Sequence, residues 1–212
     1  MLYRLIVELC RFTVRLCCRN RVTVHGAENV PAAGPAVLVA NHASYMDPPV
    51  IAMALRRQIY FMAREEILAA PVLGPILRRC GVFPVRQGAA DRAAIRRAMA
   101  LLSAGELVCV FPEGTRSKSG ELLSPQPGAA LIAARSGAPL IPVALSGTFE
   151  AYPPHARWMR PARISVAFGP PILSQAEESE GGRSQELAGI SRKIMAEIDR
   201  MLEAGRKVGA AA

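Results

Sequence analysis

Apolar residues recur along the chain with two different periods. Short runs in which nearly every residue is apolar predict buried strands at residues 36–40, 58–63, 82–85, 107–111, 140–145 and 163–168. Longer stretches with apolar residues every three or four positions predict helices at residues 48–55, 71–79, 91–103, 127–136 and 185–203. A short alternating segment precedes them at residues 21–26. Because strands and helices take turns, we expect an α/β fold with a mixed, largely parallel sheet covered by helices.

The N-terminal segment predicts a helix of another kind. Charged residues recur every three or four positions and leave the rest of the helix surface apolar: Arg4, Glu8, Arg11 and Arg15. The charges come too often for a membrane-spanning segment of about 20 apolar residues, and no signal-peptide cleavage site follows. We expect residues 1–20 to form an amphipathic interfacial helix in the membrane surface, with its arginines toward anionic headgroups. The alternative is a first helix that packs on the domain core.

The length of 212 residues allows one sizeable core and is short for two. We expect a single domain over residues 21–205 and a flexible tail over residues 206–212. Residues 174–185, SQAEESEGGRSQ, are acidic and contain Ser and Gly, so we expect an exposed connection there.

The formal net charge of +9 favours an anionic partner. Only 5% of residues are aromatic, and the chain has no zinc-finger spacing and no long basic block, so we expect no nucleic-acid partner. A phosphate-bearing substrate or an acidic membrane surface remains. The five cysteines include no C-x-x-C pair, so we expect neither a disulfide framework nor a metal site, and a reducing cytoplasmic compartment is the simplest interpretation.

A histidine follows the first long predicted strand, in the segment NHASYMDP at residues 41–48. Its place is the carboxyl end of the strand, where open α/β sheets bind their ligands. If the turn folds back, the Asp47 carboxylate can reach one imidazole nitrogen of His42 and leave the other facing outward. The chain has no G-x-S-x-G segment, so we expect this pair to deprotonate a substrate hydroxyl, with Ser44 bracing the turn. The alternative for Asp47 is the N-cap of a helix that starts at Pro48.

The segment VFPEGTRSKSG, residues 110–120, follows another buried strand and has the composition of an anion site. Gly114 permits a backbone that exposes N–H groups, Thr115 adds a hydroxyl, and Arg116 brings a planar fork suited to two phosphate oxygens. Glu113 is the acceptor of the group and could hold a substrate hydroxyl or pair with an arginine. The alternative is an ordinary surface turn.

Two further segments are weaker indicators of a site. Arg86 follows the predicted strand at residues 82–85 and could reach the edge of the same pocket. Pro142 interrupts the apolar strand at residues 140–145. A proline removes one ladder hydrogen bond, which predicts an edge strand or a bulge.

In this order, the His-x4-Asp spacing in NHASYMD and the segments GVFPVR, FPEGTRS and LIPVALSGT resemble the four sequence blocks of the glycerolipid acyltransferase family. The best-known members of that family are the lysophosphatidic acid (1-acylglycerol-3-phosphate) acyltransferases. The resemblance covers about residues 22–172. It implies a role in phospholipid synthesis, by acyl transfer from acyl-CoA or acyl carrier protein to the hydroxyl of a lysophosphatidic acid-like acceptor, with no metal or other cofactor.

The resemblance also implies roles for single residues. By position, His42 matches the general base and Asp47 matches its orienting partner. Pro142 falls in the block associated with the acyl donor. The acceptor phosphate is assigned to four residues: Glu113, Gly114, Arg116 and, in an assisting role, Arg86.

One departure concerns a lysine-containing segment that many relatives carry after the third block. Here LLSPQPGAAL has Gln126 and Pro127 and no cation, which weakens the case for a phosphomonoester acceptor, although Lys118 could substitute. The alternatives are another lyso-lipid acceptor, a thioester hydrolase, and a non-catalytic peripheral lipid-binding module. We expect a peripheral or monotopic position on the cytoplasmic face of the cell membrane.

Overall fold

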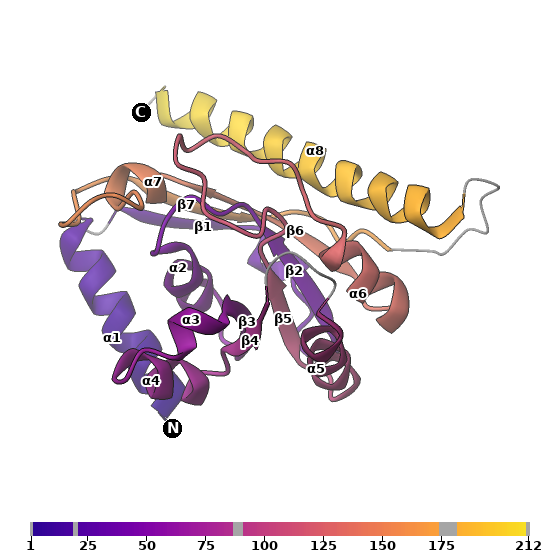
Figure 1. Cartoon of the computed structure of the whole chain (residues 1–212). Coiled ribbons are helices and arrows are strands. Elements are labelled where there is room, and N and C mark those ends of the chain that lie inside the picture. The colour runs from indigo at the N-terminus through magenta and orange to yellow at the C-terminus, as the bar shows by residue number, and fades with distance from the viewer. Residues whose placement is uncertain (1, 19–20, 87–90, 174–181, 211–212) are drawn as a thin grey trace.

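A seven-stranded sheet forms the centre of the protein (Figure 1), in a computed structural model that describes residues 2–18, 21–86, 91–173 and 182–210. The strand order is β1-β7-β6-β2-β5-β3-β4. The strands are β1 Val22–His25, β2 Ala36–Ala40, β3 Ile59–Arg64, β4 Phe83–Val85, β5 Leu107–Val110, β6 Leu140–Ser146 and β7 Ile164–Phe168. Strands β2 to β6 run parallel, whereas β7 is antiparallel to β6 and parallel to β1. The sheet is therefore mixed and largely parallel, as the sequence predicts.

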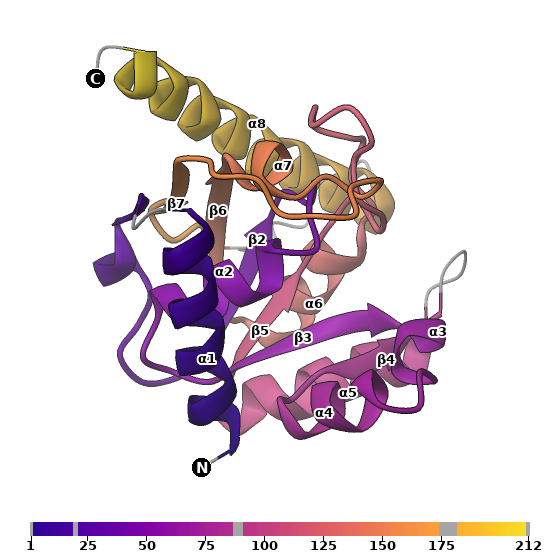
Figure 2. The ribbon, with the colours of Figure 1, turned by 90° about the vertical axis from the view of Figure 1, so that its left-hand side faces the viewer.

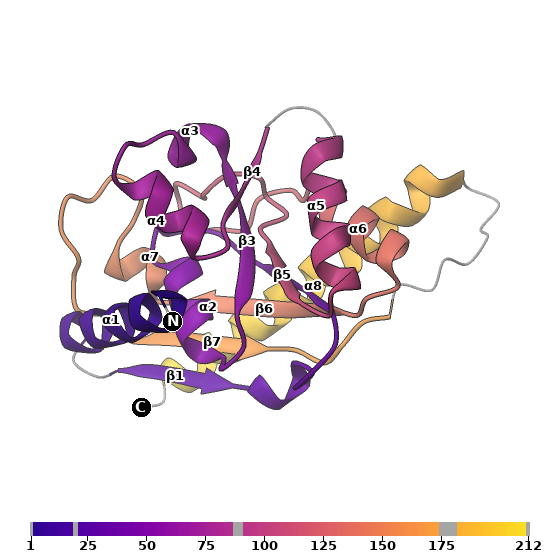
Figure 3. The same ribbon diagram turned by 90° about the horizontal axis from the view of Figure 1, so that it is seen from below.

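Helices cover both faces of the sheet, as Figures 1 and 3 show. They are α1 Leu2–Cys17, α2 Asp47–Ala54, α3 Glu65–Leu68, α4 Leu73–Arg79, α5 Arg92–Ser103, α6 Gly128–Ser136, α7 Thr148–Ala151 and α8 Gly182–Ala210, with a 3-10 turn η1 at Ala27–Asn29. One apolar cluster joins α1 and α2 to the sheet, and a second joins α5, α6 and α8 to the opposite face. The sequence pattern did not predict α3 and α7, because four residues are too few to show a helical period.

Strand β2 lies in the middle of the sheet, and all five of its residues are buried. Alternate side chains of a strand point to opposite faces. Leu38 accordingly packs in the cluster that contains Ile51 of α2, whereas Val37 packs in the cluster that contains Ile132 of α6. A strand covered on both faces must be apolar throughout, which explains the uninterrupted run AVLVA.

Pro142 lies in a central strand, so the expectation of an edge strand is wrong. The alternative of a bulge agrees with the pairing, which shifts by one residue across Pro142, from Leu140 with Ile172 to Val143 with Phe168. Strand β6 pairs with β2 on one side and with β7 on the other, and Pro142 is in register with Val39 of β2. The Pro142 carbonyl accepts a hydrogen bond from Gly169 N–H at 2.8 Å, next to Val143, where the ladder to β7 begins. The N–H group that Pro142 lacks therefore falls at the end of the β6–β7 ladder, where its absence reduces stability little.

Helix α8 is longer than the sequence pattern predicts. It begins at Gly182, inside the segment expected as an exposed connection, and continues to Ala210, through most of the expected tail at residues 206–212. The remainder of both segments lies outside the described residues. Ile194 and Ile198 anchor the helix on the sheet, and once a helix is formed each added residue gains a hydrogen bond without a new nucleation cost.

Helix α1 packs against α2, in agreement with the core-packing alternative for this segment. Val14 and Cys18 belong to the same apolar cluster as α2. Arg11 donates a hydrogen bond from Nη2 to the Met53 carbonyl at 2.8 Å, and the Tyr3 hydroxyl accepts one from Ile59 N–H. The face of α1 turned away from the core also carries exposed apolar side chains: Leu2, Leu5, Leu9, Phe12 and Leu16. Within the described chain, no helix has the length and apolarity needed to cross a bilayer.

The carboxyl ends of the five parallel strands meet at one edge of the sheet. His42 follows β2, the 113–116 loop follows β5, Arg64 ends β3 and Arg86 follows β4. Parallel strand order thus gathers most of the predicted site residues at one edge and fixes which of them are neighbours.

Candidate active site

His42 and Asp47 form the hydrogen-bonded pair that the sequence predicts. The imidazole Nδ1 of His42 lies 2.8 Å from Asp47 Oδ2. The Asp47 side chain is fully buried, whereas 17% of the His42 side chain is exposed. Among the described residues, His42 Nε2 has no hydrogen-bond partner. The pair therefore directs one basic nitrogen toward the outside while the buried carboxylate holds the other.

Asp47 is not an N-cap, which corrects the alternative interpretation of this residue. Its Oδ2 atom also accepts hydrogen bonds from the N–H groups of Ala43 and Ser44, at 2.8 and 2.7 Å. Helix α2 begins at Asp47 itself, and Met46 before it makes no side-chain cap. If Asp47 were the cap, the N2 position would fall on Pro49, which has no N–H to donate. The carboxylate is therefore free to turn back toward the histidine.

The backbone of His42 is held on both sides by the loop after β5. Its N–H donates to Glu113 Oε1 at 2.8 Å, and its carbonyl accepts from Ser117 N–H at 2.8 Å. Phe111 stacks on the imidazole, with ring centroids 4.0 Å apart and planes 21° apart. The histidine is therefore fixed by backbone bonds and ring packing in addition to its bond with Asp47.

Glu113 braces two loops, and among the described residues the structure does not show the arginine pairing that the sequence left open for it. It is buried, and its two oxygens accept N–H hydrogen bonds from His42 and Leu123 at 2.8 and 3.0 Å. No ion pair of Glu113 occurs in the described part of the chain. Burial raises the pKa of Glu113 to about 7, against the opposite effect of the two N–H donors.

The raised pKa predicts a pH-dependent stability. Because the carboxyl pKa is about 7 in the folded protein and 4.5 as the reference value, the folded state holds this proton more tightly than the unfolded state does. The contribution of the Glu113 carboxyl to the free energy of unfolding is fully present below pH 4.5 and is lost as the pH rises through 7. Glu113→Gln should remove this part of the pH dependence, measured by urea unfolding at several pH values. Equal pH profiles for the two proteins would contradict the assignment.

Arg116 lies over the ring of Tyr45, a residue of the histidine segment. The guanidinium carbon is 3.5 Å from the ring centroid, a cation–π contact. Its Nη1 atom is buried and has no hydrogen-bond partner within the described chain. Gly114 adopts a left-handed backbone, with φ of 66°, that turns the chain, and Thr115 is exposed beside it. The structure therefore brings Gly114, Thr115 and Arg116 next to the His42 turn.

Arg86 and Pro142 do not join this group. Arg86 follows β4, which is separated from β2 by β5 and β3, and its exposed side chain lies 3.4 Å from Glu65 Oε2. It borders a separate cavity of about 340 Å³ between β4 and α5. The Pro142 side chain lies near Gly169 and Met201 of α8, on the face of the sheet opposite Phe111. Neither residue contacts His42.

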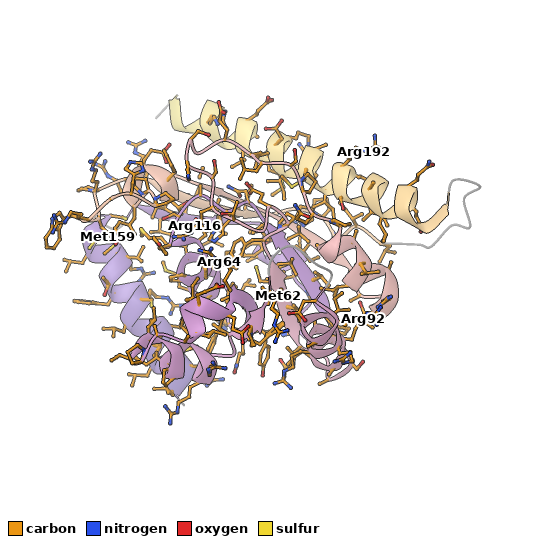
Figure 4. The ribbon with its side chains drawn as sticks, viewed as in Figure 1. Met62, Arg64, Arg92, Arg116, Met159 and Arg192 are labelled. Atoms are coloured by element: carbon orange, nitrogen blue, oxygen red, sulfur yellow. The ribbon has the colours of Figure 1, made fainter. Side chains whose placement is uncertain are left out.

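Several residues of the site were not predicted from the sequence. Asn41 exchanges two hydrogen bonds with the backbone of Leu145, at 3.0 and 2.8 Å, and so fixes the end of β2 against β6. Tyr45 and Phe111 contact Arg116 and His42 respectively. An aromatic residue next to each motif was the sequence feature that could have indicated these contacts. Arg64 ends β3 at the same edge of the sheet, and Figure 4 shows it together with Arg116.

The described site offers no protein nucleophile next to His42. Ser44 donates from Oγ to the Tyr152 carbonyl at 2.6 Å and accepts from Met46 N–H, so it braces the turn as expected. Burial, together with the nearby Asp47 charge, raises the pKa of the Cys109 thiol well above its usual range. The thiolate needed for attack is therefore not formed at neutral pH. The arrangement suits a base that takes a proton from a bound alcohol.

Comparison with known proteins decides the family. Residues 21–146, more than half of the chain, match the profile of the family described as Acyltransferase. The chain belongs to the acyltransferase family. This finding confirms the resemblance of the four sequence blocks.

Individual members of the acyltransferase family match this chain to different extents. It is 35% identical over 136 residues to the chloroplast 1-acyl-sn-glycerol-3-phosphate acyltransferase LPAT1 of Arabidopsis thaliana, and the match covers 63% of this chain and 38% of that enzyme. The 1-acyl-sn-glycerol-3-phosphate acyltransferase of Bacillus subtilis is 29% identical over 182 residues, covering 85% of this chain and 88% of that enzyme. The crystal structure of the 1-acyl-sn-glycerophosphate acyltransferase PlsC from Thermotoga maritima superposes with a TM-score of 0.81 at 28% identity, covering 96% of this chain and 79% of that one.

Proposed function

We propose that this protein transfers a fatty acyl group from a thioester to the free hydroxyl of a lysophosphatidic acid-like acceptor. The observation that carries the proposal is the His42–Asp47 pair, whose second ring nitrogen is unpartnered within the described chain, beside the cation of Arg116. The printed names of the relatives, which act on 1-acyl-sn-glycerol-3-phosphate, support this acceptor. Acyl-CoA or acyl carrier protein is the donor in this proposal, and no metal or other cofactor takes part.

The proposed reaction uses His42 as base and then as acid. The acceptor oxygen attacks the thioester carbonyl carbon while its proton passes to Nε2, and Asp47 stabilises the imidazolium that forms. The tetrahedral intermediate then collapses, the C–S bond breaks, and the imidazolium returns the proton to the departing thiolate. A positioned base of this kind accelerates transfer about 10²- to 10⁴-fold. No acyl-enzyme is formed, in keeping with the roles of Ser44 and Cys109.

A thiol-release assay tests the proposed activity. Acyl-CoA and acyl carrier protein thioesters are supplied in parallel, each with a panel of lyso-lipid acceptors and without any acceptor. We expect thiol release only with acceptor, fastest with lysophosphatidic acid. Thiol release without acceptor would indicate a hydrolase, a faster reaction with another lyso-lipid would change the acceptor, and no release would leave a lipid-binding module.

Arg116→Ala should raise the KM for lysophosphatidic acid at least about tenfold, because a charge-assisted bond to phosphate contributes about 1.5–3 kcal/mol. The kcat should change less, since Arg116 does not contact His42. Steady-state kinetics with saturating donor measures both constants. Arg135→Ala, which removes an exposed charge on α6, is the matched control and should change neither. An unchanged KM would exclude Arg116 from phosphate binding.

The outer face of α1 supports a peripheral position on the membrane, which we place on the cytoplasmic side. Its exposed apolar stripe consists of Leu2, Leu5, Leu9, Phe12 and Leu16. Exposed Arg4 and Arg15 flank the stripe and can contact anionic headgroups, while Arg11 is bonded to Met53. A long acyl chain gains about 0.8 kcal/mol per methylene buried in the bilayer, so lipid substrates stay there and the enzyme must reach them.

Leu9→Glu combined with Phe12→Glu should move most of the protein from the vesicle pellet to the supernatant. Point changes are a better test than deletion of residues 1–18, because Val14 and Cys18 belong to the core and their loss would unsettle the fold. Co-sedimentation with vesicles containing anionic lipid measures the shift, and circular dichroism checks the fold. Leu173→Glu, at an exposed apolar position elsewhere, is the control. An unchanged pellet fraction would exclude α1 as the anchor.

A further inference from the structure

The segment between α7 and β7, residues 152–163, carries an exposed tryptophan. Trp158 is 81% exposed, and Met159 beside it is exposed as well. Trp158 is the single tryptophan of the chain. Large aromatic side chains are normally buried or seated in an interface, and tryptophan is enriched where a protein meets the membrane–water boundary. The side chain therefore requires an explanation that the core of the domain does not supply.

The fold holds this segment in place. Arg160 N–H donates to the Ala151 carbonyl at 2.8 Å and closes the loop at its base. Gly147, with φ of 79°, lies so close to the Arg163 carbonyl that a Cβ there would come within 1.8 Å of the oxygen. The chain thus enters and leaves the loop through tight backbone contacts, and Trp158 projects from a closed loop.

The charges of this segment are all of one sign. Arg157, Arg160 and Arg163 are exposed and lie within five positions of Trp158 in the chain, and residues 151–163 contain no Asp or Glu. In the part of the chain that the structure describes, none of the three arginines forms an ion pair. Unpaired arginines close in the chain to an exposed indole match a surface of anionic phosphate groups above an apolar layer.

The segment lies on the same side of the molecule as the exposed stripe of α1. Cys18, directly after α1, belongs to the apolar cluster against which Ala162 of this segment packs. Figure 2 shows α1 and the 152–163 segment both toward the viewer, and Figure 4 shows Met159 near the end of α1. Figure 2 shows helix α4 on this side too, and Leu73 at its start and Val72 before it are exposed. Apolar side chains from separate parts of the sequence therefore gather on one side of the domain.

We propose that residues 152–163 form a second membrane-docking element, with Trp158 at the headgroup boundary and the arginines on anionic lipid phosphates. Together with α1 it gives the domain two membrane contacts from different parts of the chain, which fixes the orientation of the domain on the membrane. The inference rests on the proposed function only in taking the acceptor to be a membrane lipid. An acidic protein would match the arginines but not the leucine stripe of α1 beside them, so a lipid surface is the better fit.

The intrinsic fluorescence of the unmodified protein tests this directly, because every emitted photon from tryptophan comes from Trp158. Vesicles of phosphatidylcholine with phosphatidylglycerol should shift the emission to shorter wavelength and protect it from acrylamide. Lipids with brominated acyl chains should quench it. Vesicles of phosphatidylcholine alone should give a smaller effect. Unchanged emission while the protein sediments with the vesicles would overturn the proposal, as would a shift with acyl carrier protein and none with vesicles.

Trp158→Ala should lower the apparent affinity for the anionic vesicles about tenfold, because the variant removes the apolar area of the indole from the contact with the bilayer. Leu173→Ala removes an exposed side chain next to the bridge from Ile172 to Leu140, at the opposite end of β6 from α7, and should change nothing. Turnover of a short-chain, water-soluble acceptor should be equal in all three proteins. Equal turnover with equal vesicle binding refutes the docking role, whereas no turnover in any of them refutes the proposed function instead.

Discussion

Replacing His42 with alanine is expected to lower kcat about 10²- to 10⁴-fold while leaving the fold and acceptor binding in place. The imidazole is the base in the proposed reaction, and its loss removes the group that accepts the hydroxyl proton. The turn itself should persist, because His42 is also held through its own N–H and carbonyl, bonded to Glu113 and Ser117. Thiol release measures kcat, and calorimetric titration with lysophosphatidic acid measures binding.

The matched control for this substitution is His25→Ala, which removes an exposed histidine at the end of the edge strand β1. It should keep full activity. A His42→Ala protein that turns over within about tenfold of the unmodified protein would exclude general-base catalysis by this residue. Such a result would mean that another group takes the proton of the acceptor hydroxyl.

Asp47→Asn is expected to lower kcat by about as much as His42→Ala and also to lower the unfolding temperature. The carboxylate oxygen Oδ2 meets three donors, from His42, Ala43 and Ser44. Asparagine lacks the negative charge that stabilises the imidazolium, and its amide can hold the ring in the wrong tautomer. The double variant His42→Ala, Asp47→Asn should be no slower than either single variant, since both act on one proton transfer.

Ser44→Ala separates the chemical role of Asp47 from its structural one. Ser44 is buried in the same turn and bonds to Tyr152 and Met46, but its hydroxyl does not contact the imidazole. We expect a lower unfolding temperature with a much smaller loss of kcat. If Ser44→Ala lost as much activity as Asp47→Asn, bracing of the turn would account for both effects. Thermal unfolding and thiol release on the three proteins give the comparison.

Local sequence patterns were enough to predict most of the architecture and the His42–Asp47 pair of the candidate active site. An apolar run such as AVLVA predicts a buried strand wherever it lies, and the spacing from His42 to Asp47 lets the two side chains meet within one turn. Both depend on residues close together in the chain. The family resemblance added the acyltransferase family itself, which the profile match over residues 21–146 confirms.

The errors arose where distant parts of the chain meet. The sequence left open an arginine as the partner of Glu113, whereas the structure pairs its buried carboxyl with the backbone N–H of His42, 71 positions away. Pro142 suggests an edge strand because it lacks an N–H group. The prediction fails because the order of strands in the sheet depends on pairing between distant segments, which no local pattern encodes. The same holds for Arg86, which shares an edge of the sheet with His42 but is separated from it by two strands.

The carboxyl of Glu113 bonds to the backbone of His42 and to that of Leu123. The base is therefore connected to the loop after β5, which carries Arg116, and the two should move together. A bulkier headgroup that pushed this loop outward would also tilt the imidazole away from the hydroxyl it serves. Lyso-lipids whose headgroups fit poorly should therefore have a lower kcat, even where they bind with high affinity.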